Sequence, residues 1–337
     1  MDTGNWTLRA EAVTLPLAER FTISSGSWDT AENVFVTVAF GDEEGIGESS
    51  PDGRRHESCE SVIDQIEAVD LGELAEPFDL EGLGFLLPAG SARAALDIAM
   101  HDLAGKLAGV SVSQLLGVAG RRLPPTSVTL PISGPGEMVA RARRLADHPV
   151  LKMKVGFDGD VDAVGAVRAV FNGTLRIDAN EGWTRAEAIE RLHALERFDI
   201  ELCEQPIPSG RHDSLREVSA STSIPVFADE DVSTAADVAA LAGVVDGVNL
   251  KLRKTGGIRE AFKAMAVARA HGLGLMLGCD LESGVAATAQ AHLTSLVDHA
   301  DIDGPLLLAR DPWPGVGYER GMLVLPLGPG LGVEKSQ

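Results

Sequence analysis

Charged side chains lie at or near the C-terminal end of a series of short apolar runs in the second half of the chain, and each is called the closing residue of its run. The runs and their closing residues are VLKMKVG with Lys154, TLRID with Asp178, IELCE with Glu204, IPVFAD with Asp229, GVNLK with Lys251, LGLMLGCD with Asp280 and ADID with Asp301. Each closing residue lies 21 to 29 residues after the one before it. One strand and one helix need about that length, so we expect these side chains at one end of a parallel sheet.

Three carboxylates, Asp178, Glu204 and Asp229, close successive runs. Neighbouring strands would bring them together, and three carboxylates suit Mg2+ or Mn2+, hard cations that keep coordination positions open for substrate oxygens. A single acidic residue after a strand often serves as a helix N-cap instead, but three in register favour a metal site. A zinc hydrolase is disfavoured because none of the eight histidines falls at a strand end in an HxH or HxxxH pattern.

Two lysines, Lys154 and Lys251, end the second and sixth of eight expected strands, of which the first is the earlier run SVTLPI, so they lie on opposite sides of an eight-stranded barrel. Lys152 shares a strand face with Lys154, so its charge disfavours a second ammonium there and is expected to lower the pKa of Lys154. A lysine with a lowered pKa suits the role of a general base. One lysine on each face can remove and return a proton α to a carboxylate, while the metal and Lys152 stabilise the enediolate dianion. A buried ion-pair network is the open alternative, and a Schiff-base lysine fits less well because an imine needs no metal.

The elements that must position these residues follow from the spacing. Eight apolar runs, the seven above preceded by SVTLPI, alternate with alanine-rich helical segments and predict parallel strands closed into a (β/α)8-type barrel. Before them, residues 7–17 and 33–41 indicate two strands separated by a Ser- and Gly-rich loop, and a helical pattern follows, so an α+β domain precedes the barrel. The expected divisions are an α+β domain at 1–122, the barrel at 123–313, and a C-terminal segment at 314–337 that packs back on the first domain.

Composition excludes several classes of function. Against 50 Asp and Glu stand only 29 Lys and Arg, and the net charge of −21 would repel nucleic acid and anionic membrane surfaces. We expect no export signal and no membrane span, because the first residues lack a basic stretch followed by an apolar one and no run of about 18 apolar residues occurs. The three cysteines are far apart and form no CxxC pair, which fits a reducing cytoplasm. The oligomeric state is left open, with a homo-oligomer among the options.

Several motifs resemble a known family. KMK, RIDANEGW, ELCEQPI, VFADED and NLKLRKTGG resemble the successive strand-end motifs of the muconate-lactonizing-enzyme subgroup of the enolase superfamily, as do ALDIAMHDLAGKLAG and PGLGVE elsewhere. The likeness covers nearly the whole chain. It implies an α+β capping domain over a (β/α)7β barrel, Mg2+ on the three carboxylates, and acid/base lysines at Lys154 and Lys251. It also places Asn180 beside the metal ligands without binding the ion itself.

The eighth run distinguishes among members of that subgroup. Asp301 and Asp303, in DIDGPLLLARDP, resemble the D-x-D of dipeptide epimerases, which takes the free ammonium of the substrate. The two share a strand face and offer charge-assisted bonds to a cation, whereas an Asp-Gly turn would explain only Asp303. The implied reaction is 1,1-proton transfer at the α-carbon of the C-terminal residue of an L,L-dipeptide. The alternatives are a racemase of N-acylamino acids, a cycloisomerase or syn-dehydratase, and a ligand-binding barrel without turnover.

Three positions concern the side chain of the substrate. Ser25 stands where family members that act on L-Ala-L-Glu carry an arginine in a mobile capping loop, which disfavours glutamate. Asp280 replaces an apolar residue of the family's GCMxES motif, and Asp52 lies in the second capping loop, PDGRRHES. Together these positions favour a cationic or neutral side chain over glutamate, although Arg54 and Arg55 keep an acidic preference open.

Overall fold

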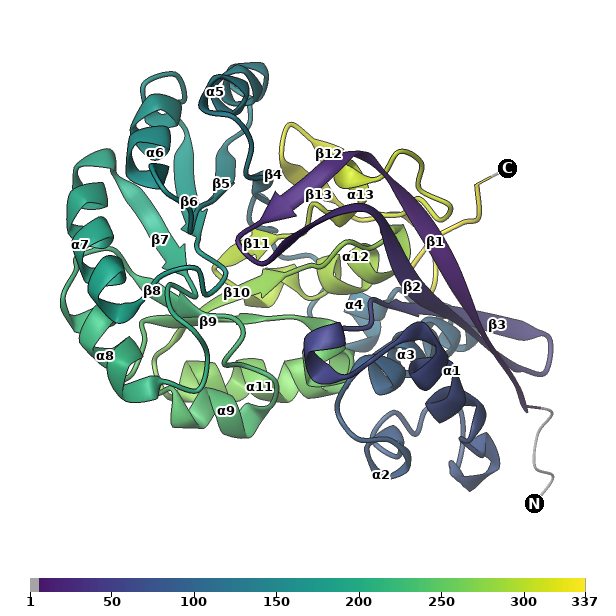
Figure 1. Cartoon of the computed structure of the whole chain (residues 1–337). Coiled ribbons are helices and arrows are strands. Elements are labelled where there is room, and N and C mark those ends of the chain that lie inside the picture. The colour runs from purple at the N-terminus through teal and green to yellow at the C-terminus, as the bar shows by residue number, and fades with distance from the viewer. Residues whose placement is uncertain (1–5, 337) are drawn as a thin grey trace.

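A closed parallel barrel forms the larger part of the computed structural model, which describes residues 6–336 (Figure 1). Its strands are β4 (Val128–Leu130), β5 (Val150–Lys154), β6 (Thr174–Asp178), β7 (Ile200–Glu204), β8 (Val226–Ala228), β9 (Gly247–Leu250), β10 (Gly274–Gly278) and β11 (His299–Asp301). They form one sheet in sequence order from β4 to β11. A parallel bridge between Thr126 and Ala300 joins the two ends. The eight strands expected from the spacing are confirmed.

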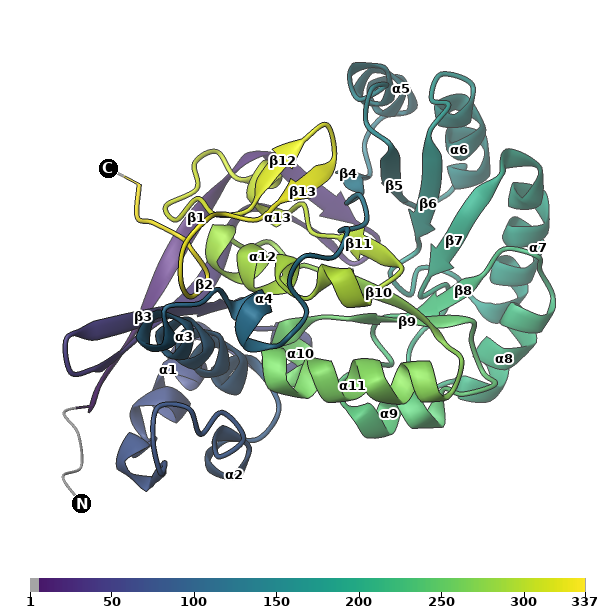
Figure 2. The same cartoon turned by 180° about the vertical axis from the view of Figure 1, so that it is seen from behind.

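Helices cover the outside of the barrel (Figure 2). They are α5 (Pro135–Arg144), α6 (Asp160–Arg168), α7 (Arg185–Leu195), α8 (His212–Ala220), α9 (Ala235–Ala240), α11 (Ile258–Ala270) and α12 (Gly284–Ala291). Short elements between or after them are the 3-10 turns η3 (Glu196–Phe198) and η4 (Thr294–Leu296) and the single helical turns α10 (Leu252–Thr255) and α13 (Gly304–Leu307). Seven covering helices alternate with eight strands, so the fold is a (β/α)7β barrel.

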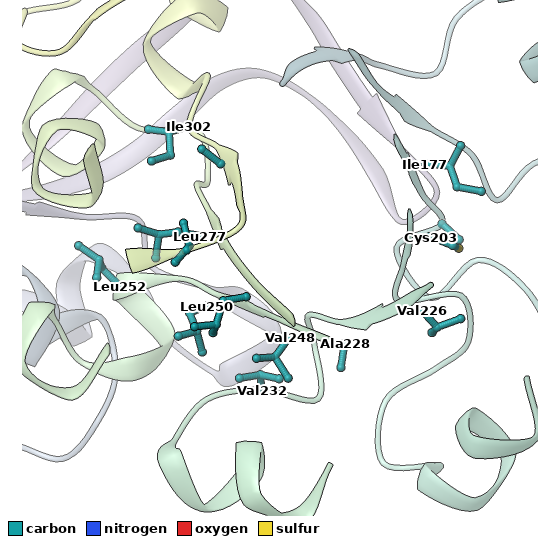
Figure 3. Packing of buried hydrophobic residues seen from close by; sticks show 14 of the residues in the cluster. Ile177, Cys203, Val226, Ala228, Val232, Val248, Leu250, Leu252, Leu277 and Ile302 are labelled. Carbon is teal, nitrogen blue, oxygen red and sulfur yellow. The ribbon is translucent and has the colours of Figure 1, made fainter. Parts of the chain in front are cut away.

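Alternation along the strands separates the core from the site. Leu151 and Met153 of β5 belong to the large buried hydrophobic cluster of the barrel. Ile177 of β6 and Cys203 of β7 belong to the same cluster and are seen in Figure 3. Because successive strand residues point to opposite faces, the charged residues between them face the interior of the barrel. The hydrophobic cluster therefore fixes the direction of every lysine and carboxylate that ends a strand.

The N-terminal domain is an antiparallel sheet covered by helices. Its elements are β1 (Trp6–Ile23), β2 (Gly26–Phe40), β3 (Glu43–Ser49), η1 (Gly53–Arg55), α1 (Cys59–Glu67), η2 (Leu71–Glu73), α2 (Leu83–Leu86), α3 (Ser91–Ala108) and α4 (Val112–Leu115). Strand β3 is glycine-rich because α3 lies directly on it: a Cβ at Gly45 would meet Ala99 O at 2.1 Å, and one at Gly47 would meet Ala95 O at 1.9 Å. That close approach buries almost all of α3.

The segment expected to be a loop between the first two strands is mostly strand. Beyond a register shift between Pro16 and Phe21, the ladder resumes and continues to the pair Ile23 and Gly26. Serine and glycine suggested a loop, but the ladder bonds are made by the backbone, and only a two-residue turn remains. The long hairpin extends from the N-terminal domain across the barrel, where Leu17 forms a bridge with Leu308 (Figure 1).

The C-terminal segment forms a small hairpin, β12 (Gly317–Glu319) and β13 (Met322–Val324), and then contacts the N-terminal domain. The amide of Gly330 donates to Val110 O at 2.9 Å, and the amide of Leu331 donates to a carboxylate oxygen of Asp102 in α3 at 2.7 Å. The last part of the chain thus links the two domains. Within residues 6–336, no helix combines the length and the apolar character that crossing a membrane requires.

Candidate active site

Three carboxylates meet at the carboxyl ends of neighbouring strands. Asp178 ends β6, Glu204 ends β7 and pairs with Asp178 in register, and Asp229 directly follows β8. All three are buried. Burial, together with the charge of Asp178, raises the pKa of Glu204 to about 8. The carboxylates of this cluster therefore lie close enough for the charge of one to oppose ionisation of the next.

Lys152 lies in the middle of this cluster. Its Nζ atom is 3.0 Å from Asp178 Oδ2, 2.6 Å from Glu204 Oε2 and 2.6 Å from Asp301 Oδ2. Burial opposes its charge, but the carboxylates outweigh burial and raise its pKa well above the usual value. Lys152 therefore lies at the centre of a buried network of ion pairs with these three carboxylates.

The donor set fits a hard divalent cation in charge and in chemistry. Within residues 6–336, no three histidine, cysteine, aspartate or glutamate side chains already stand in a metal-binding arrangement. The ammonium of Lys152 nevertheless lies between Asp178 and Glu204, so positive charge is accommodated between these two carboxylates. Oxygen ligands of this kind are those that Mg2+ prefers. Asp178, Glu204 and Asp229 as its ligands stay a prediction.

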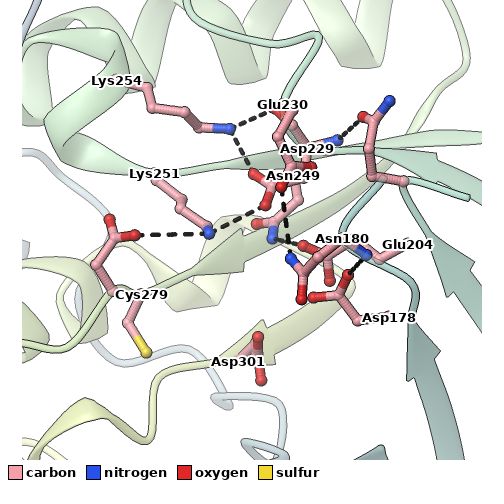
Figure 4. Close-up of polar contacts among 12 residues, drawn as sticks. Asp178, Asn180, Glu204, Asp229, Glu230, Asn249, Lys251, Lys254, Cys279 and Asp301 are labelled. Atoms are coloured by element: carbon pink, nitrogen blue, oxygen red, sulfur yellow. Dashed lines mark hydrogen bonds and ion pairs between the residues drawn. The ribbon is translucent and has the colours of Figure 1, made fainter. Parts of the chain in front are cut away.

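The two lysines expected to move protons lie on the two sides of the carboxylates. Lys154 ends β5, and its Nζ is 2.6 Å from Asp178 Oδ2. Lys251 follows β9, and its Nζ is 3.0 Å from Asp229 Oδ2 and 3.8 Å from Asp280 Oδ1 (Figure 4). Burial alone would lower the pKa of Lys251, but these two carboxylates raise it. Strands β6 to β8 separate the lysines, as the spacing predicts.

Two further polar residues of the site were not identified from the sequence. Asn249 donates from Nδ2 to Glu204 Oε1 at 2.7 Å, and Lys254 Nζ lies 2.5 Å from Asp229 Oδ1 (Figure 4). Asn249 lies two residues before Lys251, so strand alternation was a usable signal for it. Lys254 reaches the site because α10 turns the chain back after Lys251, which no periodicity in the sequence indicates.

Asn180 lies beside a carboxylate of the cluster, where the resemblance placed it. Its amide donates to Asp178 Oδ1 at 2.9 Å, and its Nδ2 donates to Glu230 Oε1 at 3.4 Å. Burial, together with the charge of Asp229, raises the pKa of Glu230 to about 7. Arg54, from the second capping loop, also reaches Glu230, at 3.4 Å. The capping domain thus contacts the barrel one residue after Asp229.

The acidic pair Asp301 and Asp303 is buried at the end of β11. Asp301 Oδ1 accepts a hydrogen bond from Ser127 Oγ at 2.5 Å. Its other oxygen, Oδ2, accepts from Lys152 Nζ, as described above. Asp303 Oδ2 accepts from the Thr129 amide at 2.6 Å, and the Cys279 thiol lies 3.6 Å from Oδ1. Burial and the neighbouring Asp301 raise the pKa of Asp303 to about 6.

Of the three residues expected to set side-chain preference, Asp280 and Asp52 come together, and Ser25 lies apart from them. Asp280 and Asp52 both contact Arg253, a residue that was not identified from the sequence. Ser25 is exposed in the turn of the β1–β2 hairpin. Its neighbour Ser24 is the residue that reaches the barrel, where its hydroxyl donates to Asn180 O at 2.8 Å.

The chain is similar to known proteins over nearly its whole length. Residues 6–117 match the mandelate racemase / muconate lactonizing enzyme N-terminal domain, and residues 137–337 match the enolase C-terminal domain-like family. An L-Ala-D/L-Glu epimerase of Bacteroides thetaiotaomicron is 36% identical over 328 residues, covering 95% of this chain and 86% of that protein. A hydrophobic dipeptide epimerase of Roseobacter litoralis is 34% identical, covering 96% of this chain and 98% of that protein.

A solved structure extends the likeness to three dimensions. The crystal structure of a dipeptide epimerase from Cytophaga hutchinsonii, complexed with Mg and the dipeptide D-Ala-L-Val, matches with a TM-score of 0.92 at 30% identity. The match covers 99% of this chain and 96% of the other. By its two domains, its barrel and its relatives, the chain belongs to the mandelate racemase / muconate lactonizing enzyme group of the enolase superfamily and, within it, to the dipeptide epimerases.

Proposed function

We propose that this protein is a Mg2+-dependent dipeptide epimerase that inverts the α-carbon of the C-terminal residue of an L,L-dipeptide. The observation that carries the proposal is the placement of Lys154 and Lys251 on two sides of one carboxylate cluster. Two bases that face one α-carbon are what a 1,1-proton transfer requires. Relatives named as dipeptide epimerases, and a solved relative complexed with Mg and a dipeptide, support the assignment.

Asp178, Glu204 and Asp229 would hold the Mg2+ ion. When bound, the ion supplies positive charge beside the substrate carboxylate, which makes the α-proton more acidic. Lys152 is fixed by carboxylates on three sides and adds a second positive charge to the same region. Negative charge that develops on the substrate carboxylate is thereby stabilised by groups already in place.

The two lysines carry the proton itself. A neutral amine on one face takes the α-proton as the C–H bond breaks, and the bonding electrons spread into the carboxylate. The ammonium on the other face then gives a proton to the same carbon, which forms the epimer. Asp301 and Asp303 supply the anionic surface for the N-terminal ammonium, which orients the dipeptide between the lysines.

The decisive experiment is hydrogen exchange in D2O. We expect the purified protein with Mg2+ to incorporate a single deuteron at the α-carbon of the C-terminal residue when it is offered L,L-dipeptide libraries grouped by that residue. N-acylamino acids, the substrates of the rival racemase activity, serve as the comparison. Exchange confined to N-acylamino acids, or no exchange in any dipeptide with metal bound, would overturn the proposal.

Two further proposals concern the setting of the enzyme. Cys59, Cys203 and Cys279 are all free, which is consistent with a reducing cytoplasm. Assembly into a homo-oligomer stays a prediction that size-exclusion chromatography with light scattering would test.

A further inference from the structure

Arg253 joins the capping domain to the barrel through two carboxylates. It lies in α10, two residues after Lys251, and is buried. Its Nε and Nη2 atoms contact the two oxygens of Asp280 at 2.5 and 3.1 Å, and its Nη1 atom contacts Asp52 Oδ2 at 3.0 Å. The planar guanidinium is thus held by two carboxylates that are 228 residues apart in the sequence.

The position of this group relative to the substrate follows from the site. An α-carbon between Lys154 and Lys251 has its carboxylate at the metal ligands and its ammonium-bearing half toward Asp301 and Asp303. The third substituent, the side chain, is left with the region toward the capping domain. Asp280 lies in that region, because its Oδ1 is 3.8 Å from Lys251 Nζ and both of its oxygens bind Arg253, which also binds Asp52 of the capping domain.

The charges in this region are already matched. Burial raises the pKa of Asp280, but Arg253 and Lys251 outweigh burial and hold that pKa at about 2. The same guanidinium helps to lower the pKa of Asp52 against its burial. A lysine or arginine side chain of a substrate would have to displace Arg253, which would leave a buried cation without its partners. A glutamate side chain would instead approach two carboxylates.

We propose that Arg253 is a specificity-determining residue: it occupies the place of a substrate cation between Asp280 and Asp52 and so sets the enzyme for dipeptides with an uncharged C-terminal side chain. The inference rests on the proposed epimerase function and narrows it. The sequence favours a cationic or neutral substrate side chain on the assumption that Asp280 and Asp52 are free carboxylates. Since both are bound to Arg253, the cationic side chain is no longer expected.

The test compares wild type with Arg253→Met and Arg253→Lys on L-Ala-L-Leu, L-Ala-L-Lys and L-Ala-L-Glu. Wild type is expected to prefer leucine over lysine by about tenfold or more in kcat/KM. In Arg253→Met the ratio should move toward lysine by a similar factor, mainly through KM, because the substrate cation replaces the missing guanidinium. Arg253→Lys keeps a positive charge and should keep the wild-type preference.

A second variant protects the test against a folding defect. Asp280→Asn leaves Arg253 with a single carboxylate, so the preference should move toward L-Ala-L-Glu rather than toward L-Ala-L-Lys. Equal turnover of leucine and lysine by wild type would overturn the inference, as would an equal loss on all substrates in both Arg253→Met and Asp280→Asn. Absence of exchange in every dipeptide would instead overturn the epimerase function itself, so the two failures are distinguishable.

Discussion

Lys152 and Asp301 form an ion pair of 2.6 Å inside the barrel. The contact joins the lysine expected to stabilise the enediolate to one of the two carboxylates expected to bind the substrate ammonium. Asp301 is therefore already compensated by a cation, whereas the contacts of Asp303 described above are an amide and a thiol. Of the two carboxylates, Asp303 is the one better placed to respond to an incoming ammonium.

The first prediction concerns the pH dependence of substrate binding. Because burial and Asp301 raise the pKa of Asp303 to about 6, this carboxyl is largely protonated below that pH and ionised above it. Only the ionised form attracts the ammonium, so KM should fall as pH rises through about 6 and then level off. Asp303→Asn should raise KM by about ten- to a hundredfold and remove this step from the pH profile. An unchanged profile in Asp303→Asn would assign the step to another group.

The second prediction separates the two faces of the site. Lys154→Ala and Lys251→Ala should each lower epimerisation by about a hundredfold or more, because one of the two proton-transfer groups is missing. The remaining lysine should still exchange the α-proton of one epimer, and the two variants should exchange opposite epimers. Proton NMR in D2O, started from the L,L and the L,D dipeptide, measures both. Lys263→Ala, a partly exposed lysine paired with Glu81, is the control. Exchange of both epimers by either single variant would contradict this arrangement.

Most of the barrel was predictable because parallel strands repeat one geometry. Regular spacing placed Asp178, Glu204 and Asp229 on consecutive strands, and alternation along each strand gave the direction of the side chains. Both signals are local, so the sequence alone carries them. The lysines Lys154 and Lys251 were found in the same way.

Contacts between distant segments were not predictable from such signals. Arg253 pairs with Asp52, and Arg54 reaches Glu230, only because the capping domain lies on the mouth of the barrel. Neither spacing nor periodicity relates those positions. The long β1–β2 hairpin was missed for a related reason, since its serine and glycine content resembles a loop while its backbone pairing decides its structure.

The third prediction concerns metal binding. Asn249 donates to Glu204 Oε1 at 2.7 Å and so orients one of the expected ligands. Asn249→Ala should therefore weaken Mg2+ binding by about ten- to a hundredfold, as loss of a partner of a metal ligand commonly does. Isothermal titration calorimetry with Mg2+ alone measures this without turnover. Asn172→Ala, at an exposed position before β6, should bind Mg2+ like wild type. Equal affinities of Asn249→Ala and wild type would argue that Glu204 does not bind the ion.

The fourth prediction concerns the attachment of the capping domain to the barrel. Glu48 in β3 is buried and accepts from Ser283 Oγ at 2.6 Å and from the amides of Ser283 and Ala286 at 2.9 and 3.1 Å, at the start of α12. Glu48→Ala would leave these donors without an acceptor, so the free energy of unfolding should fall by about 3 kcal/mol or more. Glu48→Gln keeps an acceptor oxygen and should cost less. Urea unfolding measures both, with the exposed Glu43→Gln of the same strand as control.

The same side chain links this attachment to pH. Burial raises the pKa of Glu48 above its usual value of 4.5, so between the two values the folded protein binds more protons than the unfolded chain. Stability contributed by the protonated form is therefore lost as pH rises through the raised pKa. Glutamine cannot ionise, so the difference in unfolding free energy between wild type and Glu48→Gln should shrink as pH rises above 4.5. A difference that grows with pH would show that the ionised carboxylate is the better partner for the start of α12.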